Sequence, residues 1–140
     1  MGQSLSKNNT AMYDLAEDPN SIRLIREFHD ANRIIVALCH GSAALVNVKL
    51  ADGSSILAGQ RVTGFSDTEE EQAYANKIVP PGMPFDLEQA LNKASGGKYE
   101  KATEAWTPHV IIEKSRKLLF GQNPQSAHPL AEELLKVLQS

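Results

Sequence analysis

Apolar and polar positions alternate along the first half of the chain in blocks that predict helices interleaved with short strands. Asp18-Pro19 is typical of a helix start, with the aspartate as N-cap and the proline in the first turn. Ile22, Ile25 and Phe28 then share one face of a helix that continues to about residue 31. Residues 34–38 are continuously apolar, which favours a buried strand, followed by a short helix through residue 48. Residues 61–65 predict a second strand.

The second half of the chain continues the pattern. Residues 67–71 begin a helix or an acidic turn, and the prolines at 80, 81 and 84 delay the next helix to residues 86–94. Two apolar segments, 109–113 and 118–120, predict a β-hairpin. We expect Ser126 to cap a last helix whose apolar stripe lies in the core, namely Leu130, Leu134, Val137 and Leu138. The pattern predicts one α/β domain over residues 11–140, with a mostly parallel sheet and one hairpin, after a disordered arm at 1–10.

Composition and charge narrow the class of protein. The 140 residues are 41% hydrophobic and 22% charged, which is ordinary for a soluble globular domain. The net charge is -3 and the Lys and Arg residues are scattered, so we expect no nucleic-acid partner. No apolar segment approaches the roughly 20 residues that span a bilayer. With one cysteine and no recognisable signal peptide, the sequence favours a reducing compartment, cytoplasmic or also nuclear.

The N-terminal arm carries one modification pattern. Met1-Gly2 with Ser6 matches the template for N-myristoylation of Gly2, and one acyl chain would hold the protein at a membrane only weakly.

The segment with the clearest chemistry is Cys39 and its neighbours. It is the only cysteine, it follows the apolar run 34–38, and it precedes His40, Gly41 and a series of small residues. A strand that turns sharply into a helix presents the residue at the tip in a strained conformation, as in a nucleophile elbow. Amides at the start of that helix would favour a thiolate. The alternative is that Cys39 is a small buried apolar side chain.

Four segments together resemble the ThiJ/PfpI superfamily, whose members are class I glutamine amidotransferase-like, and within it the branch of fungal heat-shock chaperones and glutathione-independent glyoxalases (glyoxalase III). They are Ala37-Leu38-Cys39-His40-Gly41-Ser42-Ala43-Ala44-Leu45, Ala58-Gly59-Gln60-Arg61-Val62-Thr63-Gly64-Phe65, Glu69-Glu70-Glu71, and Gly121-Gln122-Asn123-Pro124-Gln125-Ser126-Ala127. The resemblance extends from about residue 11 to the C-terminus.

The resemblance implies a flavodoxin-like three-layer sandwich with a Cys-His-acid triad at the carboxyl ends of its strands. The nucleophile falls on Cys39, the general acid and base on His40, and the orienting acid on Glu70, with Glu69 or Glu71 as fallbacks if the register shifts by one. Such a triad converts methylglyoxal to lactate without glutathione, metal or nucleotide, so no cofactor is expected. The other histidines, His29, His109 and His128, lack metal-ligand spacing. Homodimers are expected for the family.

The sequence also departs from the family pattern. Family members carry about two further βα units, including a glutamate against the cysteine and a Gly-Gly-His-Gly segment, whereas residues 6–10 stand here before Ala11. We therefore expect an N-terminally truncated, incomplete sandwich in which the strand at 34–38 lacks neighbours. The missing glycine segment would have supplied backbone amides near the reacting oxygen. Loss of one such donor raises the activation barrier by about 3 kcal/mol, which lowers the rate roughly a hundredfold.

Two functional classes remain open from the sequence. The first is a cysteine-dependent glyoxalase weakened by the missing units. The second is a non-catalytic stress protein, either a chaperone that uses exposed apolar surface or a redox sensor that uses Cys39. A glutamine amidotransferase half is a third reading, which the absence of a following synthase domain disfavours.

Overall fold

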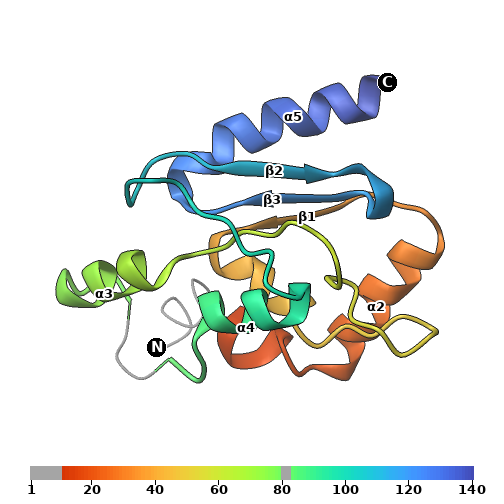
Figure 1. Cartoon of the computed structure of the whole chain (residues 1–140), viewed down its shortest axis with the longest axis horizontal. Helices are drawn as coiled ribbons and strands as arrows, with labels where there is room; N and C mark the ends of the chain where they lie inside the picture. The colour runs from red at the N-terminus through yellow and green to blue at the C-terminus, as the bar shows by residue number, and fades with distance from the viewer. Residues whose placement is uncertain (1–10, 80–82) are drawn as a thin grey trace.

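A computed structural model describes residues 11–79 and 83–140, and Figure 1 shows how its elements are arranged. The first half contains a turn of π-helix, a helix, a strand, a 3-10 helix and two further helices: η1 (Ala11–Leu15), α2 (Pro19–Asp30), β1 (Ile35–Leu38), η2 (Cys39–Leu45), α3 (Asp67–Ala75) and α4 (Leu87–Ser95). The rest of the chain contains a hairpin whose connection is a 3-10 turn, a second 3-10 turn and the last helix: β2 (Val110–Glu113), η3 (Lys114–Arg116), β3 (Leu118–Gly121), η4 (Pro124–Ser126) and α5 (Ala127–Gln139).

The sheet confirms the predicted mixture of parallel and antiparallel pairing. Its order in the described residues is β1-β3-β2, so the C-terminal strand lies in the middle. β1 pairs with β3 in parallel, with Ile35 opposite Leu118 and Leu38 opposite Gly121. β2 pairs with β3 antiparallel as the predicted hairpin. The arrangement is an incomplete α/β sandwich in which β1 has one paired edge.

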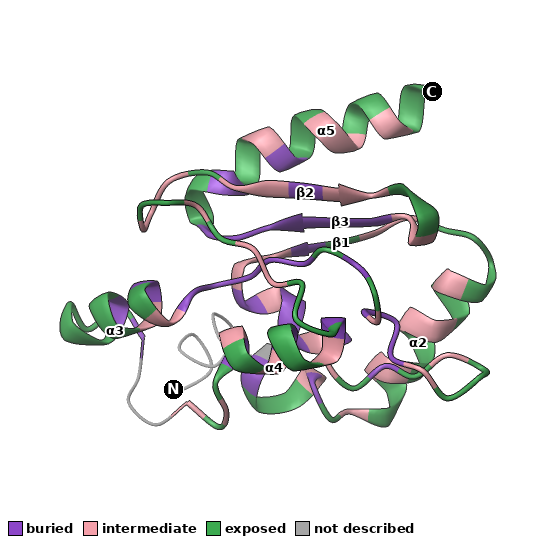
Figure 2. Cartoon of the chain, viewed as in Figure 1, coloured by how far each residue is buried: buried purple, intermediate pink, exposed green. Residues whose placement is uncertain are grey.

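The two faces of the sheet are covered by different helices, as Figure 1 shows. β3 is buried along its whole length (Figure 2), and its residues alternate between the faces. Leu118 and Phe120 belong to the main hydrophobic core, which also includes residues of η1, η2 and α4. A Cβ on Gly121 would meet Leu130 of α5, so Gly121 and Leu119 face α5. The main core therefore lies on one side of the sheet, and a thin layer under α5 lies on the other.

The predicted core stripe of the last helix is only partly right. Leu130 is buried, Leu134 and Val137 are half-buried, and Leu138 is 62% exposed. The reason is that α5 packs against β3 and β2 at its start and tilts away from the sheet toward its C-terminal end (Figure 1), so the last turns are not covered. Helical periodicity identified an apolar face, but its burial depends on what lies opposite.

Helix starts follow the local signals. The Asp18 carboxylate accepts hydrogen bonds from the amides of Asn20 and Ser21 and caps α2, as predicted. Ser66 and Glu69 form a reciprocal capping box at the start of α3, which settles the helix-or-turn alternative in favour of a helix. Asp86, the predicted first residue of the next helix, is its N-cap, and α4 begins one residue later at Leu87.

Two local predictions are wrong, and a third is only partly right. Residues 61–65 form no strand, because Val62 pairs only with Tyr99 in an isolated bridge between two loops. The helix after Cys39 ends at Leu45 rather than 48, because Val48 turns to accept a hydrogen bond from the amide of Ile56. Ser126 stands at the N-cap position of α5 as predicted, but its hydroxyl makes no capping hydrogen bond, because it is engaged with His109 and Asn123 instead.

In the described part of the chain, no helix is long and apolar enough to cross a membrane. The predicted arm at residues 1–10, with Gly2, lies outside the described residues.

Candidate active site

Cys39 lies where β1 ends and the chain turns into η2. Its φ is +58°, in the left-handed region that costs an L-residue roughly 1–2 kcal/mol. Two hydrogen bonds hold the bend, because the Ser42 hydroxyl and the Phe65 amide both donate to the Cys39 carbonyl, at 3.0 Å and 3.4 Å. The sharp turn predicted from the sequence is therefore present, with the strain at the cysteine itself.

The loop that contains Gly64 packs tightly under this bend. A Cβ on Gly64 would clash with the Ser42 side chain and with Leu91 of α4. Ser42 and Gly64 are both buried. The glycine is therefore required for the close approach that brings Phe65 to the Cys39 carbonyl. Sequence reasoning used Gly64 only as part of a family motif and gave it no role.

The His40 side chain lies between Cys39 and Glu70. Its Nδ1 is 3.7 Å from Cys39 Sγ, and its Nε2 is 2.7 Å from Glu70 Oε2. The residue is only 7% exposed, and the Phe65 ring packs against the imidazole at a centroid distance of 4.5 Å. Because a carboxylate only accepts, Nε2 carries the proton in this pair, and the lone pair of the neutral ring is on Nδ1, facing the sulfur.

The three consecutive glutamates of α3 point in different directions. Glu70 meets His40, Glu71 is exposed, and Glu69 is fully buried on the side of α3 that faces Gln122 and Asn123. The structure thus brings Cys39, His40 and Glu70 together, and it places neither fallback residue against the imidazole.

The electrostatics of the thiol differ from the sequence expectation. Burial raises the pKa of Cys39 from the ordinary 9.0 to about 12. The backbone amide of His40 acts in the opposite direction, whereas the charges of Glu69 and Glu70 raise the pKa further. The amide at the start of η2 thus favours a thiolate as expected, but burial outweighs it. Cys39 is therefore a neutral thiol at pH 7.

Hollows lined by the described residues lie near the site and away from it. One of about 340 Å³ borders Glu70 and Phe65, and Met12, Met83 and Phe85 contribute apolar walls. A larger groove of about 920 Å³ lies between η1 and α4 and is lined by none of the three triad residues. The smaller hollow is the one adjacent to the candidate chemistry.

Two of the other histidines, His109 and His128, lie near carboxylates away from this site. His109 Nε2 lies 3.6 Å from Glu100, and the exposed His128 lies 2.9 Å from Glu132. Within residues 11–79 and 83–140, no group of three or more His, Cys, Asp or Glu is placed to hold a metal ion.

Comparison with known proteins places the chain in a family. No family model matches it. Over 139 residues it is 27% identical to the Schizosaccharomyces pombe glutathione-independent glyoxalase hsp3101, covering 97% of this chain and 56% of that protein. It is 33% identical over 128 residues to the Bos taurus glutamine amidotransferase-like class 1 domain-containing protein 1, covering 89% and 53%. These relatives are those of the ThiJ/PfpI superfamily.

Solved structures agree with this assignment. The Francisella tularensis Rapid Encystment Protein 24 KDa matches with a TM-score of 0.75 and 37% identity, over 87% of this chain and 51% of that one. Candida albicans glyoxalase III has the same fold, with a TM-score of 0.75 at 24% identity, over 89% and 52%. The chain spans about half the length of the curated relatives it matches.

Proposed function

We propose that this chain carries the catalytic triad of a glutathione-independent glyoxalase that converts methylglyoxal to lactate. The observation that carries the proposal is the unbroken line of contacts from Cys39 Sγ through the two ring nitrogens of His40 to Glu70 Oε2 at a strained bend. This is the arrangement of a nucleophile, a base and a group that orients the base. The names of several relatives support the same chemistry.

The first step follows from the neutral state of the thiol. The Cys39 sulfur adds to the aldehyde carbon of methylglyoxal while His40 Nδ1 takes the thiol proton, so that a C–S bond forms and the carbonyl oxygen is protonated to a hemithioacetal. Glu70 holds Nε2–H and stabilises the imidazolium that forms in between. A preformed thiolate is not required, because the base lies beside the thiol.

The second step moves one proton between adjacent carbons. His40 removes the proton from the carbon that bears sulfur and returns it to the neighbouring carbon through an enediol, which leaves a lactoyl thioester on Cys39. Water then cleaves the C–S bond, releases lactate and restores the thiol. The substrate gains one water overall with no net oxidation, and the protein's sulfur replaces an external thiol.

The test is lactate formation from methylglyoxal without glutathione. We expect Cys39→Ser to abolish turnover while the far-UV circular dichroism spectrum is retained, and His40→Gln to lower kcat by about 10²–10⁴-fold. His128→Gln, the same change at an exposed histidine, is the matched control and should leave turnover unchanged. Full turnover by Cys39→Ser would disprove the proposal.

A second candidate, a chaperone that holds unfolded clients, is favoured by exposed apolar side chains. Leu24 and Phe28 of α2 are 55% and 45% exposed, and Val36 on the edge strand β1 is 41% exposed. Aggregation suppression that survives Cys39→Ser, falls in Phe28→Glu and comes with no lactate would support this function over catalysis.

A further inference from the structure

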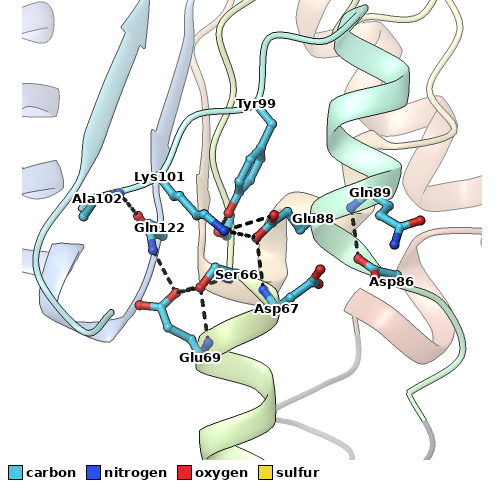
Figure 3. A network of polar contacts seen from close by, with 11 residues as sticks. Ser66, Asp67, Glu69, Asp86, Glu88, Gln89, Tyr99, Lys101, Ala102 and Gln122 are labelled. Atoms are coloured by element: carbon cyan, nitrogen blue, oxygen red, sulfur yellow. Dashed lines mark hydrogen bonds and ion pairs between the residues drawn. The ribbon is translucent and has the colours of Figure 1, made fainter. Parts of the chain in front are cut away.

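Glu69 is a fully buried carboxylate that does not touch His40, and its partners come from three separate segments. Oε1 accepts from the amide and hydroxyl of Ser66, at 3.1 Å and 2.9 Å, and from Gln122 Nε2 at 2.9 Å. Oε2 accepts from the Trp106 amide at 2.9 Å and from Asn123 Nδ2 at 2.8 Å. Figure 3 shows Glu69 between Ser66 and Gln122. Five donors therefore converge on one side chain.

The charge of Glu69 is retained because these donors are present. Burial alone would raise the pKa of the carboxyl group, but the hydrogen bonds from Asn123, Gln122, Ser66 and Trp106 outweigh burial and hold the pKa below its usual value. A buried carboxylate without partners is strongly unfavourable. Its burial therefore requires the start of α3, the segment after β3 and the loop before β2 to come together in one arrangement.

One consequence of this arrangement is the direction of Glu70. Successive residues of an α-helix point about 100° apart, so anchoring Glu69 toward Gln122 and Asn123 sets the rotation of the first turn of α3. That rotation directs Glu70 to His40 Nε2. A second contact outside this set restrains the same turn, because the Asp67 amide donates to Glu88 of α4, as Figure 3 shows.

A second consequence is the packing behind the imidazole. Trp106 has a φ of +65°, and its amide donates to Glu69 while its indole Nε1 donates to Gln72 Oε1 at 2.6 Å. The indole packs edge-on against Phe65 at 5.4 Å, and Phe65 packs against His40. Glu69 thus supports the packing of Phe65 against the His40 imidazole as well as the position of Glu70, which binds the imidazole Nε2.

We propose that Glu69 is a positioning residue that sets the geometry between Glu70 and His40 from both directions. The inference rests on the proposed function for its kinetic test. The hydrogen bond between His40 and Glu70 supplies a test that does not depend on any substrate.

The experiment compares Glu69→Gln with the wild-type chain. We expect kcat for lactate formation to fall at least tenfold with KM within about twofold, and the downfield imidazole N–H resonance of the His40–Glu70 hydrogen bond to shift or disappear. Alkylation of Cys39 should become faster, because Glu69 is one of the charges that raise the pKa of the thiol. Because unfolding would also expose the thiol and speed its alkylation, a retained far-UV circular dichroism spectrum is what separates positioning from general damage. Glu104→Gln, at an exposed carboxylate two residues from Trp106, is the matched control.

A second variant is needed because Glu69→Gln could fail to fold. Ser66→Ala removes one hydrogen bond to Glu69 and weakens the helix cap, which leaves the fold in place. We expect the same resonance to move and kcat to fall two- to fivefold. An unchanged resonance in every variant that folds overturns the positioning role. A wild-type chain that forms no lactate overturns the proposed function instead, and the resonance still decides the inference.

Discussion

The chemical state of Cys39 gives the sharpest prediction. Burial and two nearby glutamate charges raise the pKa of the thiol from 9.0 to about 12. Each pKa unit changes the ratio of thiolate to thiol tenfold, so the thiolate fraction at pH 7 falls from about 10⁻² to about 10⁻⁵. Alkylating reagents react with the thiolate, and the rate at pH 7 should be about a thousandfold below that of an ordinary cysteine.

The sequence makes the measurement simple, because Cys39 is the only cysteine of the chain. Iodoacetamide labelling followed by intact-mass spectrometry reports one thiol without interference. We expect the second-order rate constant to rise about tenfold per pH unit from pH 6 to pH 10 without a plateau. In concentrated urea the same thiol should titrate near its ordinary value, which controls for the reagent and for the local sequence.

The same shift has a consequence for stability. A thiol whose pKa is raised by folding is neutral in both the folded and the unfolded state below about pH 9, so its ionisation does not change the free energy of unfolding there. Above pH 9 the unfolded chain loses its proton first, and the free energy of unfolding falls until the pH reaches the folded pKa. Cys39→Ala should therefore lose less stability than the wild-type chain between pH 8 and pH 10.

A plateau of the labelling rate at or below pH 8 would refute this reasoning. It would mean that Cys39 and His40 form a thiolate–imidazolium pair at rest, and that neither burial nor the glutamate charges dominate the environment of the sulfur. The mechanism would then begin from a preformed nucleophile instead of a proton transfer to His40.

Four further outcomes are expected, each from a different interaction. The lowered pKa of Glu69 contributes stability that is fully present above about pH 4.5 and is lost as the pH falls through the folded pKa. The free energies of urea unfolding of the wild type and of Glu69→Gln should therefore converge on acidification, and a difference that stays constant with pH would argue against this role. Gly64→Ala should cost about 1–3 kcal/mol in urea unfolding and lower kcat, because the new methyl group meets Ser42. Leu118→Ala, at a fully buried position of the central strand, should cost about 2–5 kcal/mol in the same assay, and a smaller loss would mean that the core there can relax. Asp18→Ala should remove about 1 kcal/mol through the cap of α2, with Asp18→Asn as the variant that restores it.

The features that could be predicted from sequence are those with local causes. The start of α2 follows from an aspartate cap and a first-turn proline, and the hairpin follows from two apolar segments separated by a short polar one. The sharp bend at Cys39 was also expected, because an apolar strand there meets small residues. Interactions within a few residues decide such features, so the same residues form them in many contexts.

The features that could not be predicted depend on residues far apart in the chain. Glu69 was considered only as a replacement for Glu70, since nothing near it in sequence shows that Gln122, Asn123 and Trp106 lie around its carboxylate. Phe65 likewise has no local signal for its contact with the imidazole. A search for buried acids with several amide donors would find Glu69, but only with coordinates in hand.

The sequence by itself determined the superfamily, the order of most helices and strands, and the residues that carry the candidate chemistry, because motifs and local caps are encoded in short segments. Tertiary structure alone decided which of three neighbouring glutamates meets His40, that burial raises the pKa of Cys39, and that the end of α5 remains exposed. Each of these depends on burial and on the distance between charged groups. Those quantities exist only once segments distant in the chain are packed together.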